Sequence, residues 1–145
     1  MKTAVLLALL LSGGCVSTER FGTPADPAVL EAAVVEWQNH DLPIRAECQS
    51  DIAHLRVTLL DTNTAELNDI CPITRVTNGG RALGCTYRSG EWTSIILNTD
   101  YPETRDLALQ HELRHWLGWC SFDDQDVTHS DMRRWYDYKG HSVTK

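Results

Sequence analysis

Residues 100–118 read DYPETRDLALQHELRHWLG, a pattern that predicts one long helix. Asp100, followed three residues later by Glu103 with Pro102 between them, is typical of a helix N-terminus. Gly118 is typical of the residue that follows a helix end. We therefore expect a helix from about Tyr101 to Leu117. Its apolar residues are expected to be buried: Leu107, Leu109, Leu113, Trp116 and Leu117.

A second helix is predicted near the N-terminus. Asp26 has the residue type expected of an N-cap, and Pro27 suits the first helical position. Apolar residues follow at helical spacing, and the helix should end before Pro43.

Strands are predicted between these helices. Residues 54–62 are rich in β-forming residues and should be followed by a turn at 61–63. Residues 82–87 and 92–98 are expected to form two strands of a hairpin, and a short last helix should cover 130–138. This order predicts the α+β class, with a small mixed sheet.

The composition indicates one compact domain. The chain has 145 residues, of which 42% are hydrophobic and 23% charged, an ordinary globular balance. Its formal net charge is -7. An acidic chain without a Lys/Arg cluster is not expected to bind nucleic acid. We expect a monomer.

The first residues predict export. Lys2 precedes the apolar run from Thr3 to Leu11, which is too short to span a bilayer and is typical of a signal peptide. The small residues before Cys15 resemble a bacterial lipoprotein signal, although Ser12 stands where such signals usually have Leu. The resemblance implies a lipid on Cys15, and Val16 after it favours the outer membrane over retention elsewhere in the envelope. We expect a signal peptide at 1–14, a tether at 15–26 and one domain at 27–145.

Four further cysteines suggest two disulfides in an exported chain. Three pairings are possible. We favour Cys71–Cys85, which would close a hairpin-like segment, together with Cys48–Cys120, which would tie the N-terminal half to the end of the long helix.

The long helix carries His111-Glu112-Leu113-Arg114-His115. Two histidines four residues apart project from one helix face, so their imidazoles can bind the same Zn²⁺. Glu112 is turned about 100° from His111 around the helix axis and can move protons to and from a zinc-bound water without binding the metal. This HExxH arrangement predicts His111 and His115 as zinc ligands and Glu112 as the general base.

The eight residues from His111 to Gly118 resemble the zincin metallopeptidases, and most closely their metzincin branch. The resemblance covers residues 82–132 at most. It implies that the hairpin 82–98 borders the substrate, which we expect to lie in extended form along 92–98.

The third zinc ligand departs from the metzincin pattern. The residue at the corresponding position is Ser121, which is not a usual zinc ligand. We therefore expect His129 to be the third ligand, since a catalytic zinc needs three protein ligands and an open position. Acidic residues remain alternatives: Asp123, Asp124 and Asp126, with Asp131 a weaker one. The acidic loop could instead be solvated or bind a cation such as Ca²⁺.

Two residues further along the chain have weaker assignments. Tyr136 is a candidate hydrogen-bond donor to the oxyanion that forms during peptide hydrolysis. Met132 corresponds loosely to the methionine beneath the metal in metzincins, but core packing is the favoured explanation for it.

These expectations combine into one hypothesis and two rivals. The hypothesis is an exported, zinc-dependent peptidase of the cell envelope that acts on peptide or protein substrates. One rival is a non-catalytic envelope lipoprotein that uses the zinc-binding scaffold for binding or structure, and the other is a metal-binding protein without hydrolytic activity.

Overall fold

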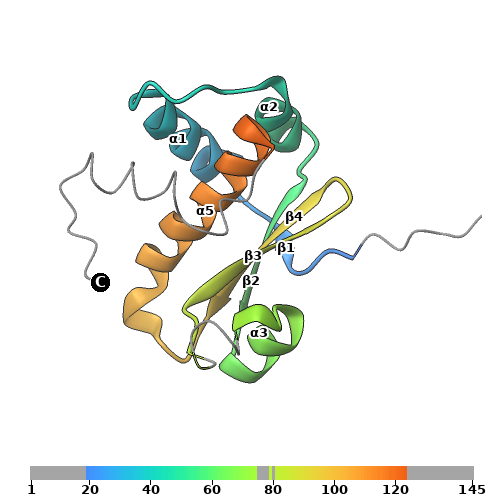
Figure 1. Cartoon of the computed structure of the whole chain (residues 1–145), viewed down its shortest axis with the longest axis vertical. Coiled ribbons are helices and arrows are strands. Elements are labelled where there is room, and N and C mark those ends of the chain that lie inside the picture. Colours follow the sequence, from blue (N-terminus) through green and yellow to red (C-terminus); the bar gives the residue numbers. More distant parts are fainter. Residues whose placement is uncertain (1–18, 75–78, 80, 124–145) are drawn as a thin grey trace, which may run out of the picture.

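The computed structural model describes residues 19–74, 79 and 81–123. They form a mixed sheet with one long helix across one face, as Figure 1 shows. This confirms the expected α+β class and the mixed sheet. The signal peptide at 1–14, Cys15 and the expected helix at 130–138 lie outside the described residues.

The sheet has four strands in the order β1-β2-β4-β3. They are β1 (Thr23–Pro24), β2 (Val57–Thr62), β3 (Gly84–Ser89) and β4 (Trp92–Asn98). β4 runs parallel to β2 and antiparallel to β3, so both of its edges are hydrogen-bonded. The expected hairpin is confirmed, with Gly90 at φ 59° in its turn.

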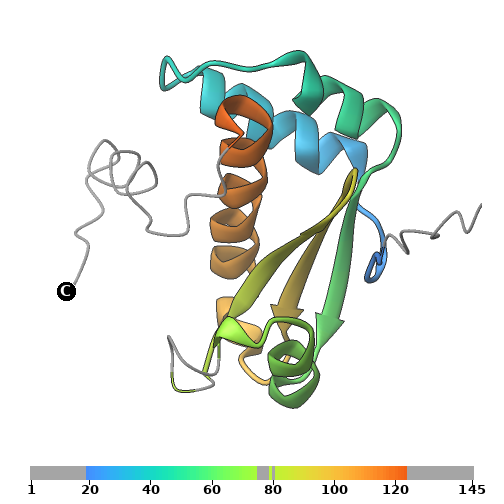
Figure 2. The ribbon, with the colours of Figure 1, turned by 45° about the vertical axis from the view of Figure 1, so that its right-hand side comes forward.

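Two helices near the N-terminus pack at one end of the sheet, which Figure 2 shows from the side. The first is α1 (Pro27–Gln38), and the Asp26 side chain accepts a hydrogen bond from the Ala28 amide as predicted. The second is α2 (Ala46–Ala53), which we did not predict. The chain leaves α2 through His54 and Leu55, the latter at φ 53°, so the expected strand begins at Val57 rather than at His54.

The expected turn at 61–63 is wrong. Thr62 still belongs to β2, and α3 (Thr64–Ile70) begins at once. The Asn63 side chain accepts a hydrogen bond from the Glu66 amide and so caps α3. Asn63 followed three residues later by Glu66 is a helix-start signal, which the expected turn did not take into account.

The long helix is α5 (Arg105–Phe122), preceded by a short 3₁₀ turn at Pro102–Thr104. Both expected ends were wrong. Asp100 does not cap this helix, because its carboxylate accepts hydrogen bonds from the amide and hydroxyl of Thr64 at 3.0 and 2.6 Å. At the other end the helix continues through Gly118 and stops at Asp123, which is in the left-handed conformation at φ 59°.

Tertiary packing explains the extension past Gly118. Cys120 and Ser121 are buried, and Cys120 is bonded to Cys48 of α2. Holding this last turn against α2 outweighs the cost of about 1 kcal/mol that a glycine brings to a helix interior.

The sheet separates two apolar clusters. The larger one lies between the sheet and α5, and is closed at one end by α1 and α2; it includes Trp37, Val57, Ile95 and Trp116. The smaller one lies on the other face beneath α3, around Leu67 and Ile96. Each cluster holds one disulfide, Cys48–Cys120 and Cys71–Cys85, so the expected pairing is confirmed. Within the described residues, no helix is long and apolar enough to cross a membrane.

Candidate functional site

His111 and His115 lie one turn apart on α5 and are both half-buried. Their ring centroids are 5.0 Å apart, with an angle of 76° between the ring planes. The two imidazoles are therefore neighbours on one helix face, as the four-residue spacing predicted.

Glu112 faces the sheet and is only 5% exposed. The Thr86 hydroxyl of β3 donates to Glu112 Oε2 at 2.7 Å and lies 3.0 Å from the Glu112 backbone oxygen. Burial disfavours the charged carboxylate and raises the pKa of Glu112 to about 7, although the hydrogen bond from Thr86 opposes this shift. A carboxyl group in this environment is suited to exchange protons near neutral pH.

Gly84 provides the space that the Glu112 side chain occupies. A Cβ atom at this position would lie 3.1 Å from Glu112 Cγ, 3.2 Å from Oε1 and 2.9 Å from the Ile96 carbonyl oxygen. Two alternate residues of β3 thus shape the site: Gly84 lets the carboxyl approach the strand, and Thr86 donates the hydrogen bond. A glycine inside a strand is a known sign of close approach, and it was the one sequence signal for this contact.

A pocket of about 460 Å³ opens beside these residues. His111 and Glu112 form part of its lining, together with the start of β3 and the first turns of α5. Leu107, expected to be buried, is 58% exposed because it lines this pocket rather than the core. The prediction of its burial was wrong.

Most candidates for the third zinc ligand lie outside the described residues: His129, Asp124, Asp126 and Asp131. The same is true of Tyr136, the candidate hydrogen-bond donor to the oxyanion. Asp123 is described: it ends α5 eight residues after His115, which is about 12 Å along the helix axis.

Across 19–74, 79 and 81–123, no three His, Cys, Asp or Glu side chains come together in a metal-binding group. Asp123 therefore does not complete a site with His111 and His115. The two imidazoles fit as partners of one zinc ion, since both belong to the preferred ligand type and lie on one face. The described residues provide no third ligand for them.

The expected position of the substrate along 92–98 was wrong. β4 is hydrogen-bonded to β2 on one side and to β3 on the other, so it has no free edge for another chain. β3 is the strand next to the histidines that has a free edge in the described sheet.

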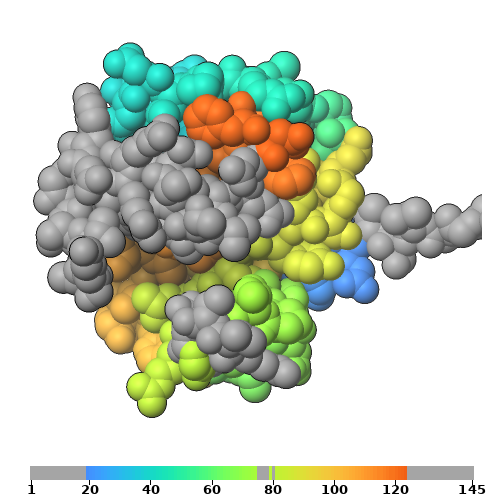
Figure 3. Space-filling view, in the orientation of Figure 1, coloured from blue at the N-terminus to red at the C-terminus, as the bar shows by residue number. Residues whose placement is uncertain are grey.

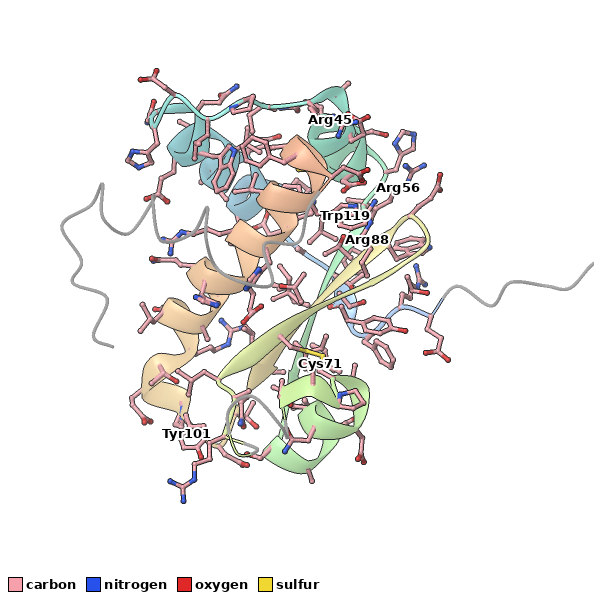
Figure 4. All side chains as sticks on the ribbon, in the orientation of Figure 1. Arg45, Arg56, Cys71, Arg88, Tyr101 and Trp119 are labelled. Atoms are coloured by element: carbon pink, nitrogen blue, oxygen red, sulfur yellow. A yellow bond between two sulfur atoms is a disulfide. The ribbon has the colours of Figure 1, made fainter. Side chains whose placement is uncertain are left out.

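A second buried polar group lies at the other end of β3. The Asp51 carboxylate of α2 accepts a hydrogen bond from Trp116 Nε1 at 3.0 Å and lies 3.7 Å from Arg88 Nη1. Arg88 also donates to the Thr93 hydroxyl and stacks on Trp119, with its guanidinium carbon 4.6 Å from the ring centroid. Figure 4 shows Arg88 and Trp119 side by side at this end of the molecule.

These contacts hold the C-terminal half of α5 against α2 and the hairpin. In Figure 3 the end of α5 lies beside α1, α2 and the hairpin on one face of the molecule. Trp116 directly follows His115, so the same contacts limit rotation of the helix at the second histidine. The expected burial of Trp116 is confirmed, but its buried partner Asp51 was not predicted from the sequence.

Comparison of the chain with protein-family models, with curated proteins and with solved structures finds no match. We therefore infer the function from the geometry of the site.

Proposed function

We propose that the protein is a zinc-dependent peptidase of the cell envelope. The observation that carries the proposal is the arrangement on α5: two neighbouring imidazoles, His111 and His115, with the buried carboxyl group of Glu112 between them in sequence and a pocket beside them. In this proposal His129 supplies the third imidazole, and Tyr136 remains a candidate donor to the oxyanion.

Each residue has a distinct role. His111 and His115 hold the zinc, which when bound supplies a Lewis acid that polarises the peptide carbonyl and makes water a better nucleophile. Glu112 takes a proton from the attacking water and delivers it to the leaving amine. Thr86 and Gly84 orient the Glu112 carboxyl, and the low exposure of that carboxyl keeps bulk water from competing for the proton.

Zinc content and turnover test this proposal together. We would measure zinc by atomic absorption, and hydrolysis with a mixed peptide library, in the full chain and in Glu112→Gln. We expect about one zinc per chain in both proteins and a loss of turnover of about 10²–10⁴-fold in Glu112→Gln. Glu103→Gln, a change at an exposed carboxyl near the start of the same helix, is the matched control and should keep full turnover.

Other outcomes separate the rivals. Zinc without turnover in the wild-type protein would favour the non-catalytic envelope lipoprotein. A protein that binds no zinc at all would overturn the proposal. His129→Ala should weaken zinc binding; unchanged affinity would move the third ligand to Asp124 or Asp126.

The proposed location in the cell envelope can be tested separately. This part of the proposal depends on residues 1–15, above all on Cys15 as the lipidated residue. We expect the full chain to enter the detergent phase when produced in a bacterium that processes lipoproteins, and Cys15→Ser to remain in the aqueous phase. Equal partitioning of the two would contradict the lipid anchor.

A further inference from the structure

The pocket next to His111 and Glu112 has a chemical character that the proposed function does not explain. One wall is the segment that leads into β3, with Ala82 and Leu83, and the opposite wall is α5, with Leu107 and Ala108. These four side chains are aliphatic. An apolar ligand group that enters the pocket would remove the exposed surface of Leu107 from water, which is favourable.

A cation accompanies this apolar lining. Arg81 is exposed and lines the same pocket. In the part of the chain that the structure describes, no ion pair involves Arg81, whereas Arg45, Arg56, Arg88 and Arg105 each have an acidic partner. A guanidinium group without a carboxylate is well suited to bind one from a ligand, because its planar fork matches both carboxylate oxygens.

The position of the pocket connects these features to the reaction. His111 and Glu112 line it as well, so a group bound there would be held next to the site of proton transfer. The groove between α1 and α5 differs in this respect: it is lined by Glu36 and Asp106 and contains neither His111 nor Glu112.

We propose that this pocket selects peptides in which an aliphatic side chain lies next to the reacting bond and a carboxylate follows it. The aliphatic walls would bind the side chain, and Arg81 would bind the carboxylate. The inference rests on the proposed peptidase function. The carboxylate can be the C-terminus of the peptide or the side chain of an Asp or Glu, and these sources are distinguished below.

Binding can be measured without hydrolysis by using the full chain with Glu112→Gln. The probes are three peptides with a fluorescent label at the N-terminus: Ala-Ala-Leu with a free C-terminus, Ala-Ala-Leu-Asp-amide and Ala-Ala-Leu-Asn-amide. We expect at least one carboxylate peptide to bind about tenfold more tightly than the Asn-amide peptide. Tighter binding of the free C-terminus would indicate a carboxypeptidase-like preference, and tighter binding of the Asp peptide an endopeptidase preference for acidic residues.

Two substitutions in the same background test the two halves of the pocket. Arg81→Gln should remove the preference for a carboxylate and leave binding of the Asn-amide peptide within about twofold. Leu107→Ser should weaken the binding of all three peptides to a similar extent. Arg45→Gln, at an exposed arginine before α2, is the matched control and should change nothing.

The inference and the proposed function fail in different ways. Equal affinity for all three peptides, or an Arg81→Gln protein that keeps the carboxylate preference, would overturn the inference even if the wild-type protein hydrolyses peptides. Selective binding that depends on Arg81, in a protein whose wild-type form shows no zinc-dependent hydrolysis, would support the pocket and overturn only the peptidase function.

Discussion

Two carboxyl groups are buried against the same face of β3, and their surroundings differ. Asp51 is 3% exposed and faces a cation, Arg88, and an indole N–H, that of Trp116. Glu112 is 5% exposed, and its carboxyl accepts a hydrogen bond from the neutral hydroxyl of Thr86 while also lining a pocket. Burial raises the pKa of both groups.

The contrast shows how one strand builds two kinds of environment. Gly84, Thr86 and Arg88 alternate along β3 and point to the side of α5. Where the strand presents a cation, the carboxyl is held in place and contributes to the packing of α2 and α5. Where it presents only a hydroxyl and a glycine, the carboxyl keeps a pKa of about 7 and remains next to a pocket. The difference separates a structural carboxyl from one suited to chemistry.

The largest stability effect is expected at the structural carboxyl. Asp51→Ala leaves the guanidinium of Arg88 largely buried without its acidic partner, which should cost about 3–5 kcal/mol in the free energy of unfolding. Urea denaturation measures this loss. Asp61→Ala breaks the exposed pair with Arg105 and should cost less than about 1 kcal/mol. Equal losses in the two variants would contradict a structural role for Asp51.

At Glu112 the effect should depend on pH. Because burial raises its pKa from 4.5 to about 7, the folded protein favours the protonated carboxyl. The stability that this proton contributes is fully present below about pH 4.5 and is lost as the pH rises through about 7. The glutamine side chain in Glu112→Gln does not titrate, so this pH-dependent contribution to stability is absent from the variant.

The metal-free Glu112→Gln protein should therefore be more stable than the metal-free wild type above pH 8, by up to about 3 kcal/mol relative to their difference at pH 4.5. Urea denaturation with a chelator at several pH values measures the difference. Glu103→Gln is the exposed control. Parallel stability curves for wild type and Glu112→Gln would show that the carboxyl is not desolvated as described.

Gly84→Ala tests the close approach of Glu112 to β3. The added Cβ would lie 2.9 Å from the Ile96 carbonyl oxygen and 3.1 Å from Glu112 Cγ, and should cost about 1–3 kcal/mol. The double variant with Glu112→Ala removes part of this crowding, so the two changes should be non-additive by more than about 0.5 kcal/mol. Additive effects would indicate that the whole loss of stability comes from the contact with the Ile96 carbonyl oxygen.

The smallest effect is expected for Thr86→Val, which keeps the shape of the side chain but removes the hydroxyl. The loss of one hydrogen bond should cost about 1 kcal/mol. It should also raise the pKa of Glu112 further, because the Thr86 hydroxyl stabilises the ionised carboxylate. NMR titration of the Glu112 carboxyl carbon measures this shift, and Thr86→Ser should restore the wild-type value. Failure of the serine to restore it would contradict the role of the hydroxyl.

Local patterns predicted much of the fold. The cap at Asp26, the hairpin around Gly90 and the helix that carries the two histidines all follow from residues close in sequence. The predictions failed where distant contacts compete with local signals. Asp100 bonds to Thr64 of α3 instead of its own helix, and α5 passes through Gly118 because Cys120 is bonded to α2.

The same distinction between local signals and distant contacts applies to the candidate site. The spacing of His111 and His115 predicted that their rings would be neighbours, since helix periodicity is a local property. The partners of Glu112 could not be predicted, because Thr86 and Gly84 meet it only after the hairpin packs against α5. The pocket beside Leu107 could not be predicted either, because the helical pattern alone assigned Leu107 to the core.

The sequence by itself determined that two imidazoles one turn apart share a helix face and that the carboxyl group between them in sequence is turned about 100° away from it. The tertiary structure decided what surrounds each group, including the hydroxyl opposite Glu112, the cation opposite Asp51 and the interior position of β4. The physical reason is that helix geometry depends on neighbouring residues, whereas burial and charge pairing depend on segments brought together by packing.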